Sequence, residues 1–365
     1  MFGSVIANID RHSVEPWDIY PYAGDYSHGI ADKFLAGEII SWFTDSVSVD
    51  KVFAIAVSLG IVLCLLLAIF SGQVIRHSSQ ENKTAVIATV FVLWMLPSGI
   101  GGLFRYIGVP DIFMALTLLL CIMLAKNRYL LWIVPLLSAA AVGFHQIYTT
   151  LYFPTLFVAI CFFALYEKRS VSGFAVAAIT TLTTLASFIY ITFFSSRYLT
   201  FGSIDSLVEY LNSKSDMNFD DEFLRWVFSG QYFSGVELYA DGALTMVIDY
   251  EVLLITGIVL LPLFAIIFYT YFSAMRESTD KKRKFLFFLC SVSWIPSMAT
   301  CFLMRNIFRI LAALWMTQFL IVSLFLYFGD ADFLAAFNRV KSFIIKYRFA
   351  AIVYFLFILL YRKWI

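Results

Sequence analysis

The sequence predicts an all-α integral membrane protein, with about ten transmembrane helices in a single polytopic domain over residues 1–365. Of the 365 residues, 61% are hydrophobic and 14% are charged, and the mean hydropathy is +0.84. A soluble domain has no need of so much apolar surface. Most apolar runs also reach the roughly 17–25 residues that a helix needs to cross a bilayer. The predicted spans are 52–73, 84–97, 110–125, 129–145, 148–165, 172–195, 252–275, 285–303, 310–328 and 348–361.

Charges in the connecting loops predict the orientation of the chain. Cytoplasmic loops carry an excess of lysine and arginine. Here these residues cluster in alternate loops, at Arg76 and Lys83, Lys126 and Arg128, Lys168 and Arg169, Arg276 to Lys284, and Arg339 to Arg348. Segment 196–251 has ten acidic and three basic residues, and the difference is −7. We therefore expect 196–251 to be a large extracytoplasmic loop, on the same side as the N-terminal segment 1–51.

Two topologies stay open for the N-terminal segment, because we place no span before residue 52. Either the first span inserts with its N-terminus outside, or a further helix precedes this sequence. Arg362 and Lys363 fall outside in the same topology, against the charge rule, which indicates that one short span is miscounted. Residues 34–43, FLAGEIISWF, are too few to cross a bilayer and predict an amphipathic interfacial helix.

Five ionisable residues lie in or beside the predicted spans. They are Arg105, Asp111, His145, Arg305 and Arg309. A charge in the hydrocarbon region costs about 2.5–3.5 kcal/mol on insertion scales, so such residues usually face a polar cavity. The loop charges place all five at the outer ends of their helices. We therefore predict a cationic pocket that opens to the outside.

Arg305 and Arg309 are four residues apart, so on a helix they share one face and repel each other. Two interpretations stay open. In the first, both guanidinium groups reach the membrane interface from a short outer turn. In the second, they clamp a phosphate or diphosphate, whose oxygens accept paired hydrogen bonds from guanidinium and whose charge would relieve the repulsion.

Arg105 and Asp111 lie in SGIGGLFRYIGVPD, whose glycines argue against a continuous helix. Pro110 and Asp111 suit the first turn of the helix that follows, and we expect Asp111 to cap that helix. Arg105 either pairs with Asp111 or joins the cluster of Arg305 and Arg309.

His145 ends the fourth span. It is either a structural histidine or a general acid or base, since the unperturbed pKa of imidazole is about 6.5. The N-terminal motif GDYSHGIADK is either a hydrated loop or part of the outer site. In the second case Asp25 is a candidate base for a sugar hydroxyl, and His28 is a candidate substrate contact. The rival acidic cluster is Asp220, Asp221 and Glu222, although such clusters are usually solvated.

Several classes of function are disfavoured. The sequence has no phosphate-binding glycine-rich loop with lysine, no GxSxG, no HExxH and no CxxC. Its five cysteines fall in apolar segments, where cysteine packs as a small hydrophobe. We predict no cofactor and no metal site. The net charge of +1 offers no basis for a nucleic-acid partner.

The order of these features resembles bacterial exopolysaccharide and O-antigen polymerase-like membrane proteins, which act on lipid-linked sugars. Three stretches carry the resemblance: DYSHGIADKFLAGEIISWFTDSVSVDKVFAI, FRYIGVPDIFMALTLLLCIMLAKNRYLLWIVPLLSAAAVGFHQ and MRNIFRILAALW. They cover most of the first 150 residues and a patch near 305. Each motif is loose, and their order and side of the membrane are more specific than any one of them.

The resemblance implies a multi-pass protein of the bacterial inner membrane that makes capsule, exopolysaccharide or O-antigen. Its substrate would be a glycan on a polyprenyl diphosphate carrier, with membrane lipid and polysaccharide-assembly proteins as further partners. Asp25 and His145 would be catalytic. The residues that would bind substrate are Arg105, Arg305, Arg309 and His28. Such proteins usually have one or two further spans at the N-terminus.

Two other functions stay open on the sequence alone. A transporter or flippase of a lipid-linked glycan would use the same arginines without a base, but the sequence has no inverted repeat. A structural or assembly subunit would use every charge to hold its own fold.

Overall fold

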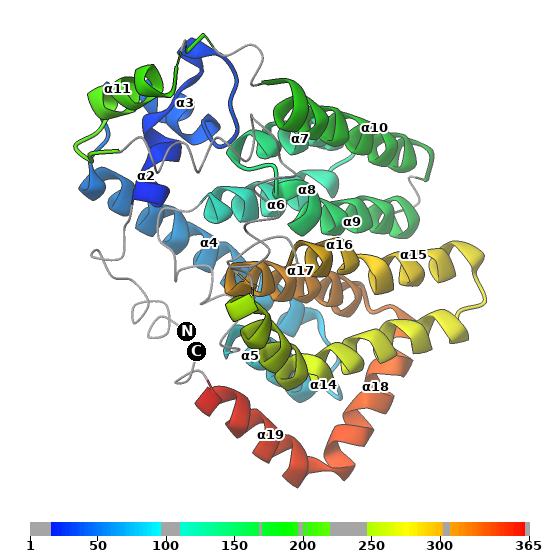
Figure 1. Cartoon of the computed structure of the whole chain (residues 1–365). Helices are drawn as coiled ribbons and strands as arrows, with labels where there is room; N and C mark the ends of the chain where they lie inside the picture. Colours follow the sequence, from blue (N-terminus) through cyan, green and yellow to red (C-terminus); the bar gives the residue numbers. More distant parts are fainter. Residues whose placement is uncertain are drawn as a thin grey trace.

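The computed structural model describes residues 16–95, 110–167, 170–195, 200–201, 203–219, 247–301 and 307–361. Over these ranges the chain is helical, and its only strand-like pairing is an isolated bridge between Val47 and Ser215. The helices lie in stacked layers, from α7 and α10 on one side to α18 and α19 on the other (Figure 1). The expected all-α architecture is therefore confirmed for the described residues.

The first half of the chain supplies the elements α2 (Pro16–Ala23), η2 (Tyr26–His28), α3 (Leu35–Ser41), α4 (Val49–His77), α5 (Lys83–Met95), α6 (Asp111–Ala125), η4 (Leu130–Ile133), α7 (Val134–Phe144), α8 (Tyr148–Leu151), α9 (Phe153–Tyr166), α10 (Ser170–Ile189) and η5 (Tyr190–Phe194). The second half supplies α11 (Ile204–Lys214), α14 (Val247–Glu277), α15 (Lys281–Val292), α16 (Ile295–Cys301), α17 (Ile307–Phe328), α18 (Ala331–Lys346) and α19 (Arg348–Tyr361).

Five helical stretches are long and apolar enough to cross a membrane. They are Val49–His77, Val171–Phe194, Gly257–Glu277, Lys281–Cys301 and Arg309–Phe328. The other five predicted spans coincide with shorter apolar helices of 10–17 residues. The described residues therefore have an apolar helix at each predicted span, and five of these helices have the length of a full crossing.

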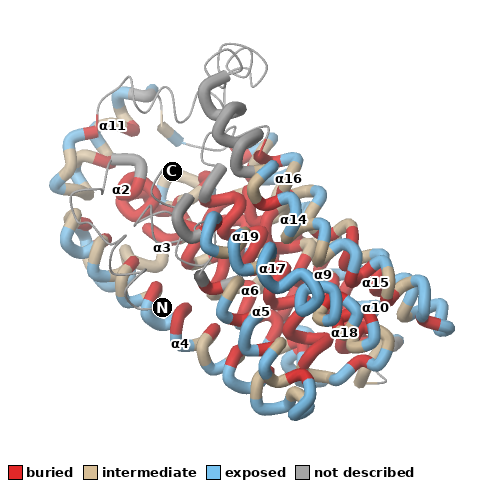
Figure 2. Tube along the Cα trace, turned by 90° about the horizontal axis from the view of Figure 1, so that it is seen from below, coloured by how far each residue is buried: buried red, intermediate tan, exposed pale blue. Residues whose placement is uncertain are grey.

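Helix α17 forms the centre of the bundle. Almost all of its described side chains are buried, and it contacts α4, α5, α9 and α16 (Figure 2). Trp315 of α17 stacks on Phe264 of α14, with ring centroids 4.6 Å apart. Because α17 is apolar on all sides, it is suited to an interior position. A charged residue on this helix therefore lies close to the core.

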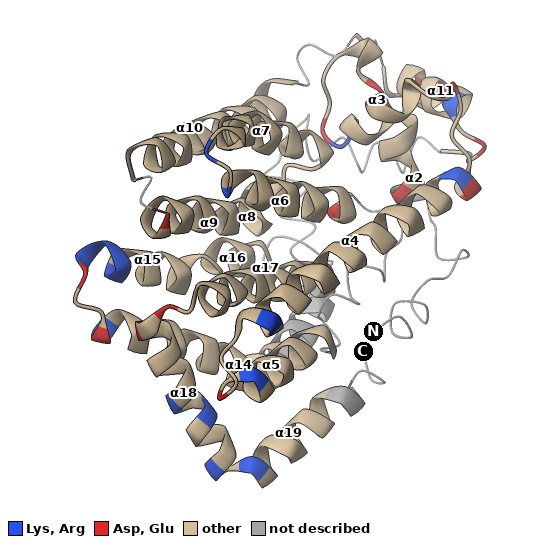
Figure 3. Ribbon diagram, turned by 180° about the vertical axis from the view of Figure 1, so that it is seen from behind, with Lys and Arg blue, Asp and Glu red and all other residues tan. Residues whose placement is uncertain are grey.

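The two ends of the bundle carry different charges. Basic residues gather around the starts of α7 and α15 and along α18, at what we call the basic end (Figure 3). The opposite end carries α2, α3 and α11, together with the start of α6, the end of α7 and the start of α17. We call it the site end. Helix α18 contacts the turn between α4 and α5 at the basic end, where Lys341 Nζ donates to the carbonyl oxygen of Glu81 at 2.9 Å.

The N-terminal elements pack closely onto the site end. A Cβ atom on Gly37 of α3 would lie 1.8 Å from the carbonyl oxygen of Gly24, so this position has no room for a side chain. A Cβ atom on Gly143 of α7 would lie 2.9 Å from the hydroxyl oxygen of Tyr26. These approaches hold the chain between η2 and α3 above the end of α7, where His145 lies.

The N-terminal segment also contacts the segment around α11. The amide nitrogen of Thr200 donates to the carbonyl oxygen of His28 at 2.9 Å, and that of Val47 donates to Lys214 at 2.7 Å. Two regions expected on one side of the membrane, parts of 1–51 and 196–251, are thus in contact. The residues expected to form an interfacial helix include α3, which ends beside the exposed Trp42 and Phe43.

Candidate functional site

An ion pair between Asp111 and Arg309 is the first part of the site. Asp111 is the first residue of α6 and is 1% exposed, and Arg309 is in the first turns of α17. Arg309 Nε lies 2.6 Å from Asp111 Oδ2. Among the described residues, neither carboxylate oxygen of Asp111 accepts a well-oriented hydrogen bond. Arg309 is therefore the partner that compensates the buried charge of Asp111 among the described residues.

The expected capping role of Asp111 is not observed. Asp111 does lie at the start of the helix after Pro110, but its side chain makes no capping hydrogen bond to α6. The guanidinium of Arg309, which is 198 positions later in the sequence, lies against the carboxylate instead. Full charge attracts a buried carboxylate more strongly than the partial charge of a helix end.

Asp32 and His145 form the second part of the site. His145 follows α7 and is 5% exposed, and Asp32 precedes α3 and is 2% exposed. His145 Nδ1 lies 3.8 Å from Asp32 Oδ2, and the amide nitrogen of Gln146 donates to Asp32 Oδ1 at 3.1 Å. The carboxylate of Asp32 thus faces the turn that positions the imidazole ring.

Lys33 contributes a second cation. Its Nζ lies 3.9 Å from Asp32 Oδ2, and its side chain is 17% exposed. Burial lowers the pKa of Lys33, as does the charge of Arg309, while Asp32 raises it. Lys33 and Arg309 are therefore close enough to affect each other. The described part of the site is charge-balanced, because each of the two cations has a carboxylate beside it.

The electrostatic environment keeps His145 neutral at neutral pH. His145 lies in the turn between α7 and α8, and burial lowers its pKa well below the usual 6.5. The charges of Lys33 and Arg309 lower this pKa further. A neutral imidazole has a nitrogen that accepts a proton, which is what a general base requires.

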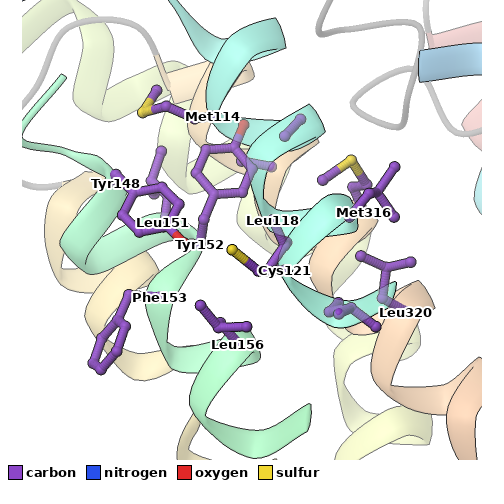
Figure 4. Close-up of a cluster of buried hydrophobic side chains, with 14 of the residues drawn as sticks. Met114, Leu118, Cys121, Tyr148, Leu151, Tyr152, Phe153, Leu156, Met316 and Leu320 are labelled. Atoms are coloured by element: carbon purple, nitrogen blue, oxygen red, sulfur yellow. The ribbon is translucent and has the colours of Figure 1, made fainter. Parts of the chain in front are cut away.

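Two buried tyrosines line the interior side of the site. Tyr148 and Tyr152 stack with ring centroids 6.1 Å apart, above Cys121 and Leu118 of α6 (Figure 4). Neither hydroxyl oxygen has a hydrogen-bond partner among the described residues. Below them the packing is apolar, so the polar groups of the site are confined to the end of the bundle.

Asp25 and His28 lie in a neighbouring cluster that faces α11. Asp25 accepts hydrogen bonds from Ser27 and lies 3.5 Å from Lys214 Nζ. Burial raises the pKa of Asp25, but hydrogen bonds from Ser27 and Tyr210 and the charge of Lys214 outweigh it and lower the pKa. The His28 ring packs on Phe201, with centroids 4.3 Å apart. A stabilised carboxylate of this kind is a weaker base than one whose pKa is raised.

The structure brings together two of the six predicted site residues, His145 and Arg309, and adds three partners: Asp32, Lys33 and Asp111. Arg105 and Arg305 lie outside the described residues. Asp32 and Lys33 were visible in the motif GDYSHGIADK, but its pattern is equally typical of a hydrated loop. In the structure, the low exposure of their side chains, 2% for Asp32 and 17% for Lys33, distinguishes them from residues of a hydrated loop.

No protein-family model, no curated protein and no solved structure matches this chain. Within the described ranges, His, Cys, Asp and Glu side chains form no group of three that could hold a metal ion. The five cysteines are free and buried. Inference about function therefore rests on the residues of the site and on the resemblance of the sequence motifs.

Proposed function

We propose that this chain is a membrane enzyme of bacterial surface polysaccharide biosynthesis, acting in the inner membrane on capsule, exopolysaccharide or O-antigen. It would transfer or polymerise glycan units from a polyprenyl diphosphate carrier on the outer face. The observation that carries this proposal is a set of two ionic groups at the site end, Asp111 with Arg309 and Asp32 with His145 and Lys33, in which the charge of Arg309 acts on both Lys33 and His145. Ionisable groups inside a membrane protein mark functional sites more often than structural ones.

The chemistry of these side chains suits glycosyl transfer. The hydroxyl of an acceptor sugar attacks the anomeric carbon, and the bond from that carbon to the diphosphate oxygen breaks. His145 accepts the hydroxyl proton, and Asp32 holds the turn that carries it. Arg309, with Arg105 and Arg305 as predicted partners, stabilises the negative charge on the departing diphosphate. Asp25 remains a second candidate base.

The distribution of charge favours an enzyme over a transporter. In the described ranges, every Asp, Glu, Lys and Arg lies near an end of an apolar helix or outside these helices. A transported polar substrate needs polar groups near the middle of the bilayer. Chemistry at one face needs them only at that face.

All ten apolar helices are proposed to cross the membrane, with the site end outside. Cysteine labelling tests this orientation, because the five native cysteines are buried. Ser46 at the site end and Thr279 at the basic end are both exposed. Ser46→Cys is expected to react with an impermeant maleimide on intact cells, and Thr279→Cys only after permeabilisation. The reverse pattern contradicts the proposed orientation.

The reaction itself is tested with purified protein and a polyprenyl-diphosphate-linked glycan. His145→Ala is expected to lower the initial rate of transfer by about 100-fold or more, the usual contribution of a general base. Because the pKa of His145 is lowered, the wild-type rate should stay constant as the pH falls through 6.5 and decline only at more acidic pH. An unchanged rate in the variant removes His145 from the mechanism, and absence of transfer by wild-type protein removes the proposed function.

A further inference from the structure

Lys33 has an unusual backbone conformation. Its φ angle is 70°, and it is the only residue other than glycine with positive φ in the described parts of the chain. A side chain with a Cβ atom is strained there, and such strain persists only where the surroundings compensate for it. Glycine would adopt this conformation without strain. The presence of lysine therefore indicates that its side chain has a role that outweighs the strain.

The ammonium of Lys33 is largely buried and incompletely bonded. Its nearest carboxylate oxygen is Asp32 Oδ2 at 3.9 Å, beyond hydrogen-bond distance. The ring of Tyr20 lies beneath it, with Nζ 5.4 Å from the centroid. Within the described ranges the three N–H groups have no hydrogen-bond acceptor. A buried ammonium with unused donors is costly unless a ligand accepts from it.

Lys33 also lies beside the rest of the site, because Asp32 Oδ2 is 3.9 Å from Lys33 Nζ and 3.8 Å from His145 Nδ1, and the charge of Arg309 acts on both Lys33 and His145. Asp111 lies against Arg309 and Asp32 lies near Lys33, but the ammonium of Lys33 keeps its donors, and an anion that reaches them gains charge-assisted hydrogen bonds. Residues 33 and 309 come from opposite ends of the sequence, so their approach is a product of the whole fold. Folding of α3 alone does not require it.

We propose that Lys33 is a phosphate-binding residue, and that its ammonium and the guanidinium of Arg309 together hold a diphosphate. The inference deepens the proposed function, on which it rests for the identity of the ligand as the diphosphate of a lipid-linked carrier. The two groups are complementary, since lysine provides a compact charge and arginine a planar pair of donors. Phosphate oxygens supply the acceptors that Lys33 lacks.

Binding of inorganic diphosphate to full-length protein in nanodiscs tests the inference by calorimetry. Lys33→Gly removes the ammonium and also the backbone strain. We expect it to weaken diphosphate binding about tenfold or more, as loss of a charge-assisted hydrogen bond does, without lowering the thermal unfolding temperature. Lys33→Arg should retain binding within a few fold. The matched control is Lys51→Met, at an exposed lysine whose Nζ donates to Thr44 and Ser46, and its binding should be unchanged.

Three results overturn the inference: wild-type affinity in Lys33→Gly, no binding by the wild-type protein, or a lower unfolding temperature in Lys33→Gly. The last would show that the lysine serves the fold. Farnesyl diphosphate separates the two sources of ligand. Tighter binding of farnesyl diphosphate than of inorganic diphosphate supports a lipid-linked carrier as the ligand. Equal affinity for the two compounds contradicts the assignment to a lipid-linked carrier. Failure of glycan transfer with normal diphosphate binding refutes the proposed function and leaves the Lys33 assignment intact.

Discussion

Asp111 and Asp330 are both buried aspartates near the start of a helix, each beside an arginine, yet their surroundings differ. Asp330, at the basic end, accepts hydrogen bonds from Tyr166, Arg283 and the amide nitrogen of Phe333. Asp111, at the site end, touches Arg309 without a well-oriented hydrogen bond. A carboxylate with donors from three elements holds those elements together, whereas Asp111 has the single partner Arg309 among the described residues.

The structural role of Asp330 is visible in what it joins. Its side chain caps α18, and its partners come from the end of α9 and the start of α15. Removal of this carboxylate therefore affects three helices at once. At the site end, by contrast, the Asp111 pair joins only α6 and α17.

Asp330→Ala is expected to destabilise the fold by several kcal/mol without affecting the site. It removes the cap, worth about 1 kcal/mol, and hydrogen bonds to a charged group, worth roughly 1.5–3 kcal/mol. The total loss in free energy of unfolding should be about 2–4 kcal/mol. Unfolding in a denaturing detergent measures this loss. Transfer activity per folded molecule should remain at the wild-type level, and its loss would break the distinction between the two ends.

A smaller effect on stability is expected from the double substitution of Asp111→Leu and Arg309→Met. Replacement of a whole buried ion pair by apolar side chains is often neutral or stabilising. The double variant should therefore unfold within about 1 kcal/mol of the wild type. Arg309→Met with Asp111 left intact provides the matched control, because it leaves one buried charge without its partner and should cost about 3–5 kcal/mol. A double variant as unstable as this control would assign the pair to folding.

The helices were predictable from sequence because apolar runs are a local signal. The span predicted at 110–125 corresponds to α6, and Pro110 and Asp111 mark its start. Helix α18 lies where the basic residues Arg339, Lys341 and Lys346 predict a cytoplasmic loop. The helix is amphipathic: its apolar face, with Phe333, Ala336, Phe337 and Val340, is buried, and the helix packs against α14.

The site was only partly predictable, because its contacts join distant parts of the chain. His145 and Arg309 stand out as ionisable residues in apolar surroundings. The pairing of Arg309 with Asp111 depends on how α6 and α17 pack, which no local pattern records. Lys33 is marked by its backbone angle and burial, and neither property can be read from the residue type.

The role of the Asp111 and Arg309 charges is measured by the chain length of surface polysaccharide in cells that carry only the double variant Asp111→Leu and Arg309→Met. If these charges serve a ligand and not the fold, the protein accumulates in the membrane at the wild-type level while polymer growth is lost. Polysaccharide of wild-type length in these cells would contradict this role.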